Sequence, residues 1–225
     1  MTEGGKLYDW MHGKRYPFIA KQVMSLVGKD AMVIDYGSLT GGVVDILRAN
    51  GYSSVTPCEI KESVTDSGVT DVMLIDPAPA PLPFEDHSLD LIIFTDVIEH
   101  LTDPLPLLLD FKRVLKPGGV LLITTDNVFR IVFKIKYLLN INIFQDLDRY
   151  LTYPRYRLHH RQYSMAELKR LMTQHLGFRV VDYKYRDFVG SASPSLRIIE
   201  RILYCVSFLI PNLRNTLYIA GCNQC

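Results

Sequence analysis

The chain has 225 residues, of which 48% are hydrophobic and 22% are charged. This is the composition of an ordinary soluble globular protein, and the length allows one sizeable core but is tight for two. The formal net charge is only +1, so the overall charge provides no attraction to a nucleic acid. We therefore expect a single domain over residues 1–225, and we do not expect a nucleic-acid partner.

The ends of the chain and the cysteines point to the cytoplasm. Residues 1–6 contain no apolar run of the kind that a signal peptide needs, and no stretch reaches the roughly 20 apolar residues of a membrane span. Of the four cysteines, only Cys222 and Cys225 lie close together, and a single C-x-x-C pair lacks the second half of a zinc site. We expect a cytoplasmic protein with reduced thiols and without a metal site.

Hydrophobic spacing and turn residues predict the elements of the first half of the chain. In order, they are a helix over 16–27, a strand over 31–36, a helix over 40–50, strands over 54–58, 72–75 and 89–95, a helix over 104–115 and a strand over 120–125. A proline-rich loop is expected over 77–83 and a turn over 117–119, because proline cannot continue a ladder or a helix. Strands that alternate with helices at this spacing indicate a mostly parallel α/β sheet.

The pattern changes in the second half. Residues 128–163 interleave arginine and lysine with tyrosine, and an insertion of this length is usually functional. A helix over 165–175 begins at Ser164, because Glu167 follows three residues later and completes a capping box. Strands are expected over 178–185 and 217–220, and a strongly apolar helix over 195–210. This last helix could pack in the core, form a homodimer contact, lie on a membrane surface or cover an apolar acceptor.

The most informative motif is the run 33–42. An apolar strand ends in the acid Asp35, a turn containing Gly37 and Gly41 follows, and a helix begins. Glycine lets the backbone approach a ligand closely, and the first amides of a helix attract polar groups. Rossmann folds bind dinucleotides with this layout, and a variant of it binds S-adenosylmethionine.

Five stretches carry a resemblance to a known family: 33–41, 55–59, 82–101, 111–127 and 160–178. They resemble the class I S-adenosylmethionine-dependent methyltransferases, in particular the subgroup that includes small-molecule and quinone-biosynthesis enzymes. The resemblance implies a Rossmann-like α/β fold, with a mostly parallel seven-stranded sheet flanked by helices. It also implies S-adenosylmethionine as the cofactor.

The resemblance assigns cofactor-binding roles residue by residue. The first motif would hold the methionine part and ribose, an acid after the second strand would bind the ribose hydroxyls, and a later acid would lie near the adenine. The implied cofactor-binding residues are Asp35, Gly37, Ser38, Gly41, Glu59, Ile60, Asp76, Thr95 and Asp96. Leu39 stands where the family usually has glycine, so its side chain either narrows the room for the cofactor or demands a shifted turn. The two glycines could instead serve only a tight turn, and Glu59 could be a solvated loop acid.

The acceptor side must come from the residues that the cofactor motifs do not use. Histidine can take a proton near neutral pH, and His159, His160 and Tyr163 form the densest titratable cluster of the segment 128–163. His100, after the fourth strand, is a further candidate for a general base or an orienting group. The alternatives are a favourable helix-dipole contact for His100 and a polar hinge for the cluster.

Methyl transfer from a sulfonium requires mainly orientation and closeness, and a base is needed only for an acceptor that arrives protonated. We expect transfer to a small-molecule, glycan or lipid-precursor acceptor, at oxygen, with the segment 128–163 forming part of the acceptor site. Two alternatives remain: a degenerate member that acts as a scaffold, and an RNA methyltransferase.

Overall fold

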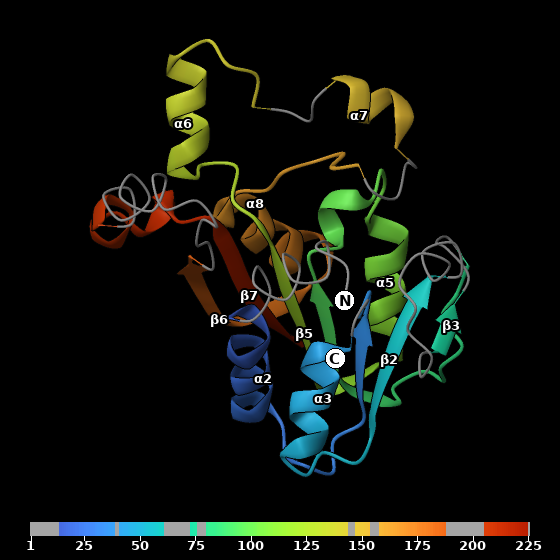
Figure 1. Cartoon of the computed structure of the whole chain (residues 1–225). Coiled ribbons are helices and arrows are strands. Elements are labelled where there is room, and N and C mark those ends of the chain that lie inside the picture. The colour runs from blue at the N-terminus through green and yellow to red at the C-terminus, as the bar shows by residue number, and fades with distance from the viewer. Residues whose placement is uncertain are drawn as a thin grey trace, which may run out of the picture.

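A seven-stranded sheet forms the centre of the molecule. The computed structural model describes residues 14–38, 41–60, 73–75, 80–143, 147–153, 158–187 and 205–224. The strands are β1 (Val33–Tyr36), β2 (Val55–Ile60), β3 (Met73–Ile75), β4 (Leu89–Thr95), β5 (Leu115–Asp126), β6 (Phe178–Arg186) and β7 (Thr216–Asn223). Their order is β3-β2-β1-β4-β5-β7-β6. Strand β7 pairs antiparallel with both β5 and β6, and the other pairs are parallel. The predicted mostly parallel sheet is confirmed (Figure 1).

Helices cover both faces of the sheet and extend past one of its edges. They are α2 (Arg15–Leu26), α3 (Gly42–Ala49), α5 (Leu105–Val114), α6 (Ile131–Leu138), α7 (Leu147–Thr152) and α8 (Met165–Arg170), with short turns at η1 (Ile98–His100), η3 (Leu171–His175) and η4 (Pro211–Leu213). The predicted helices 16–27, 40–50, 104–115 and 165–175 correspond to α2, α3, α5 and the pair α8–η3. Of the predicted helix 195–210, residues 195–204 lie outside the described residues, and 205–209 are helical.

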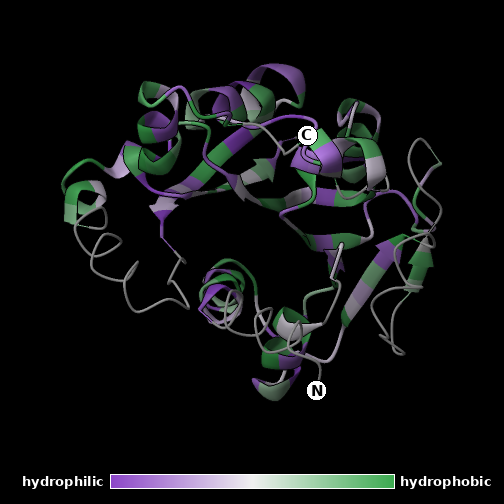
Figure 2. Cartoon of the chain, turned by 45° about the horizontal axis from the view of Figure 1, so that its top comes forward, coloured by the Kyte–Doolittle hydropathy of each residue, from purple (hydrophilic) through white to green (hydrophobic). Residues whose placement is uncertain are grey.

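Two hydrophobic clusters, one on each face, make a three-layer fold. Side chains of α2 and α3, such as Val23 and Leu47, pack with alternate strand residues such as Val33 on one face. Side chains of α5 and α8 pack on the other face. The flanking helices alternate green and purple along their length (Figure 2), which is the amphipathic pattern of helices that cover a sheet. Strand β4 is buried at five of its seven residues, as expected for a parallel strand covered on both faces.

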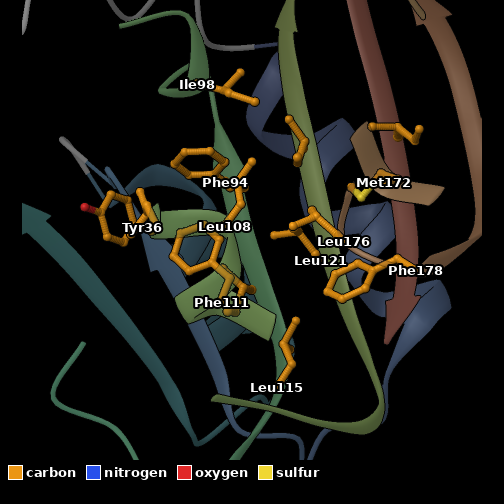
Figure 3. Close-up of a cluster of buried hydrophobic side chains, with 14 of the residues drawn as sticks. Tyr36, Phe94, Ile98, Leu108, Phe111, Leu115, Leu121, Met172, Leu176 and Phe178 are labelled. Atoms are coloured by element: carbon orange, nitrogen blue, oxygen red, sulfur yellow. The ribbon is translucent and has the colours of Figure 1, made fainter. Parts of the chain in front are cut away.

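Aromatic packing fixes β1, β4 and α5 relative to one another. The rings of Tyr36, Phe94 and Phe111 meet edge to face, with centroids 5.0–5.6 Å apart (Figure 3). Edge-to-face pairs of this kind contribute about 0.5–1.5 kcal/mol beyond the area they bury. The carboxyl end of β1 is therefore held rigidly next to that of β4.

The predicted turn at 117–119 lies inside β5 rather than before it. Leu89 pairs with Leu115 and Leu91 with Val120, so four residues of β5 bulge outward opposite Asp90. Gly118 has φ of +83° there, and Lys116 Nζ lies 2.8 Å from both Asp90 carboxylate oxygens. The turn is thus retained as a bulge, and the strand continues through it.

The end of the chain segment 128–163 is anchored by α8. The predicted capping box is present, since Ser164 Oγ accepts from Glu167 N at 3.3 Å and Glu167 Oε2 accepts from Ser164 N at 2.8 Å. Helices α6 and α7, which the sequence analysis did not predict, lie beyond the edge where the parallel strands end (Figure 1). Within the described ranges, no helix is long and apolar enough to cross a bilayer.

Candidate active site

The first part of the site is the turn that follows β1. Gly37 N and Ser38 N both donate to Cys58 O, at 2.8 and 3.2 Å, which ties the turn to β2. Gly37 has φ of +79°, and a Cβ atom there would lie 2.4 Å from Val97 Cγ2. Gly41, at φ +70°, precedes α3 directly. Glycine is therefore required at position 37 by both conformation and space.

Leu39 and Asp76 lie outside the residues that the structure describes. Whether the Leu39 side chain narrows the cofactor site, and whether Asp76 lies near an adenine, both stay predictions.

Two buried acids lie side by side at the ends of β1 and β2. Asp35 is 2% exposed and Glu59 5% exposed, and Glu59 Oε1 accepts from Ile60 N at 3.1 Å. Burial, and then the charge of Glu59, raise the pKa of Asp35 from 3.8 to about 7. Within the described part of the chain, Asp35 Oδ1 and Ser38 Oγ are buried and lack a hydrogen-bond partner. Because an unsatisfied buried polar atom costs about 1–3 kcal/mol, these groups suit a ligand with positive charge and several hydrogen-bond donors.

The end of β4 contributes Thr95 and Asp96. Asp96 has φ of +54°, a rare conformation that aspartate tolerates better than most residues. Two hydrogen bonds hold Asp96 against β5: its N–H donates to Thr124 O at 2.9 Å, and Thr124 Oγ1 donates to Asp96 Oδ1 at 3.3 Å. The carboxylate of Asp96 also forms an ion pair with Arg15 of α2. The chain thus turns sharply after β4, and this turn leads into η1.

The second part of the site is a cluster of Glu99, His100 and His159, which we call the acceptor cluster. Each residue offers one potential ligand atom, and these three atoms all lie within 4.8 Å of one another. The two imidazole rings meet edge to face, with centroids 4.6 Å apart. Asp126 at the end of β5 borders the cluster, with Oδ2 3.9 Å from His159 Nδ1. Residues from η1, from the end of β5 and from the segment before α8 therefore converge at the carboxyl edge of the sheet.

Backbone hydrogen bonds bring this segment to η1. The N–H groups of His160 and Arg161 donate to Glu99 O at 2.7 and 3.2 Å, and His100 Nδ1 lies 3.1 Å from Leu158 O. A carbonyl oxygen only accepts, so His100 Nδ1 carries the hydrogen and Nε2 carries the lone pair. The structure thus brings His100 next to His159, a contact that the sequence did not predict.

Burial sets the charges of the acceptor cluster. It lowers the pKa of His100 to about 4, with the neighbouring His159 as the next cause, and it lowers the pKa of His159 as well. Burial, followed by the charge of Asp126, raises the pKa of Glu99. Both imidazoles are therefore neutral at pH 7 and offer lone pairs.

The remaining candidate, Tyr163, lies in the core. It is 4% exposed, and among the described residues its hydroxyl has no hydrogen-bond partner. Burial raises its pKa to about 12, so the hydroxyl stays protonated at neutral pH and can only donate or accept a hydrogen bond. Its role as a catalytic residue stays a prediction, and a hydrogen-bond donor fits its surroundings better than a base.

Sequence reasoning did not single out Glu99, Thr125 or Asp126. Thr125 Oγ1 donates to Glu99 Oε2 at 2.8 Å, and Arg130 lies 3.0 Å from Asp126. The available signal was positional, because Asp126 ends the fifth strand and Glu99 precedes His100 directly. Polar residues at the carboxyl ends of adjacent parallel strands meet at one edge of the sheet.

The fold and the carboxyl-edge site define a class I methyltransferase fold. A family model described as a methyltransferase domain matches residues 11–183, and the chain belongs to this family.

The chain is similar to proteins from bacteria and archaea. It is 36% identical over 103 residues to a probable S-adenosylmethionine-dependent methyltransferase of Mycolicibacterium smegmatis, a match that covers 46% of this chain and 34% of that protein. The chain thus matches about a third of the length of that relative. A methyltransferase from Haloferax volcanii, solved with the activator Trm112, superposes with a TM-score of 0.65 at 17% identity over 99% of this chain and 93% of that one. A SAM-dependent methyltransferase from Archaeoglobus fulgidus superposes with a TM-score of 0.61 at 15% identity, over 96% and 98%.

The residues present fit S-adenosylmethionine. The orphaned acceptors Asp35 Oδ1 and Ser38 Oγ match a ligand that carries an ammonium group, a sulfonium and ribose hydroxyls. The carboxylate of Glu59 is buried next to them, and a carboxylate can accept from two hydroxyls at once. The turn at Gly37 leaves no room for a side chain and is bound to β2 at Cys58, the residue before Glu59.

Proposed function

We propose that the protein transfers the methyl group of S-adenosylmethionine to an oxygen atom of a small-molecule acceptor, with a glycan or lipid precursor as the expected class. The supporting observation is that two unlike groups of side chains share the carboxyl edge of the sheet. Orphaned acceptors lie at the ends of β1 and β2, and neutral imidazoles lie beyond the end of β4. The first group suits a cationic cofactor, and the second suits a hydroxyl.

The chain's own residues divide the work. When bound, S-adenosylmethionine supplies a methyl group that is already activated as a sulfonium, so the protein mainly needs to hold the two reactants close and aligned. Asp35, Ser38 and Glu59 would hold the cofactor. The acceptor cluster would orient the acceptor hydroxyl and make the loss of its proton easier, since both imidazoles offer lone pairs at pH 7.

An apolar acceptor is favoured by the surface that surrounds this edge. Leu138 of α6 is 83% exposed and Leu151 of α7 is 70% exposed, and Leu209 in the described end of the segment 195–210 is 79% exposed. Lys134 and Lys136 lie on α6 among these apolar residues. Apolar side chains next to cations are typical of surfaces that lie on an anionic bilayer, so we include peripheral contact with a membrane in the proposal.

The test is calorimetric titration of the full chain with S-adenosylmethionine and S-adenosylhomocysteine. Both should bind with one site per chain, and Glu59→Gln should weaken both at least tenfold by removing the acceptor charge. Asp45→Asn, on the exposed side of α3, is the matched control and should bind as the wild type does. Transfer of labelled methyl groups to a panel of phenols, sugars and isoprenoid alcohols then identifies the acceptor class. Absence of binding to folded protein would end the proposal.

A further inference from the structure

The acceptor cluster has the composition and size of a metal site. The geometry points to a divalent transition-metal ion held by Glu99, His100 and His159. Their potential ligand atoms all lie within 4.8 Å of one another. Metal bonds of about 2.0–2.2 Å place two ligands of one ion at most about 4.4 Å apart, so small side-chain rotations suffice to close the site. No cysteine takes part, so the argument against a zinc site on Cys222 and Cys225 does not apply here.

The hydrogen-bond partners of the cluster already hold its ligands in place. His100 Nδ1 donates to Leu158 O at 3.1 Å, which leaves the lone pair on Nε2. Thr125 Oγ1 donates to Glu99 Oε2 at 2.8 Å. Metal-ligating histidines usually donate their other N–H to a carbonyl or carboxylate, and ligating carboxylates are themselves hydrogen-bonded. The surroundings of the cluster therefore match the usual outer shell of a metal site.

The charge balance also favours a cation. Glu99 is 2% exposed and lies close enough to Asp126 for the two negative charges to repel. Arg130 lies 3.0 Å from Asp126, and Arg15 offsets part of the negative charge of Glu99. His159, whose Nδ1 lies 3.9 Å from Asp126 Oδ2, is a neutral imidazole and adds no positive charge. A divalent ion between Glu99 and His159 would reduce this repulsion and replace the water that burial has removed from Glu99.

Two imidazoles and one carboxylate select the kind of ion. Imidazole suits zinc, copper, iron and nickel better than calcium or magnesium, and the carboxylate also suits manganese. Three protein ligands leave coordination positions open. If the proposed methyl transfer is correct, an open position would hold the acceptor oxygen. A metal-bound hydroxyl is more acidic, so its proton could pass to solvent water without a side-chain base. His100 and His159 would then act as ligands.

The experiment uses the full chain, freed of metals with a chelator and titrated with Mn²⁺ while the signal of free Mn²⁺ is followed by electron paramagnetic resonance. We expect one Mn²⁺ per chain and its displacement by Zn²⁺. His159→Asn and Glu99→Gln should each weaken Mn²⁺ binding at least tenfold, because the first removes an imidazole ligand and the second replaces an anionic carboxylate with a neutral amide. His175→Asn, an exposed histidine outside the cluster, should bind as the wild type does.

The outcomes are separable. Glu99→Gln alters a buried residue, so the decisive variant is His159→Asn, whose side chain is 34% exposed; circular dichroism would confirm that it folds. Equal Mn²⁺ affinity in His159→Asn and wild type, or no stoichiometric binding by the wild type, would overturn the metal site. Calorimetry with S-adenosylhomocysteine on the same samples tests the proposed function by itself, since Asp35 and Glu59, the acids expected to hold the cofactor, lie on β1 and β2.

Discussion

The carboxyl group of Asp35 should make the stability of the protein without cofactor depend on pH. Asp35 is buried between β2 and β4, and its pKa is raised from 3.8 to about 7 by burial and by Glu59. For an acid whose pKa is raised on folding, the folded state is favoured most below about pH 4, and this advantage is lost as the pH rises through 7. One pKa unit corresponds to about 1.36 kcal/mol, so full ionisation of Asp35 costs about 4 kcal/mol.

The substitution Asp35→Asn removes this charge and keeps the shape of the side chain. By the same linkage, the ionisation of Asp35 lowers the free energy of unfolding by about 1.7 kcal/mol at pH 5 and by about 4.3 kcal/mol at pH 8. Relative to wild type, the free energy of unfolding of the variant should therefore be about 2.6 kcal/mol higher at pH 8 than at pH 5. Any cost of the new amide group is independent of pH and cancels in this difference.

The assay is urea denaturation followed by circular dichroism at pH 5 and pH 8 without cofactor. Asp45→Asn makes the same chemical change in the first turn of α3, where the side chain is exposed, and serves as the control. The stabilisation by Asp35→Asn, after subtraction of the control, should change between pH 5 and pH 8. A change below about 0.5 kcal/mol would refute the reasoning. Asp35 would then be solvated or paired in solution.

Two further predictions concern other parts of the molecule. Ser164→Ala should lower the free energy of unfolding by about 1 kcal/mol at pH 7, measured by urea denaturation. Burial alone would raise the pKa of Glu167, but its hydrogen bonds with Ser164 and Arg161 lower this pKa. The contribution of Ser164 to the free energy of unfolding should therefore fade as the pH falls through the lowered pKa of Glu167. An effect of Ser164→Ala that is equally large at low pH would contradict this coupling. Leu138→Gln together with Leu151→Gln should reduce sedimentation with phosphatidylserine vesicles at least threefold, whereas Met24→Gln, exposed on α2, should not. Equal sedimentation of all three proteins would exclude these helices as the contact.

The elements that could be predicted from sequence are those specified by local patterns. The strand–turn–helix over 33–49 follows from an apolar run and from glycines that adopt positive φ at 37 and 41, and the start of α8 follows from two residues that are three positions apart. The bulge in β5 could not be predicted as part of a strand. Its ladder resumes only because β4 and β7 lie on either side of β5, and no local signal carries that information.

The sequence by itself determined the order of the seven strands, the helices α2, α3, α5 and α8, the family and the glycine turn after β1, because periodicity, glycine conformation and capping depend on neighbouring residues. Tertiary structure decided the chemistry of the site. Glu99 and His159 are 60 positions apart, and they meet because the N–H groups of His160 and Arg161 bind Glu99 O. The raised pKa of Asp35 likewise depends on burial and on a second acid from another strand. Electrostatics act through space, so groups that are distant in the chain set each other's charge only once the sheet has formed.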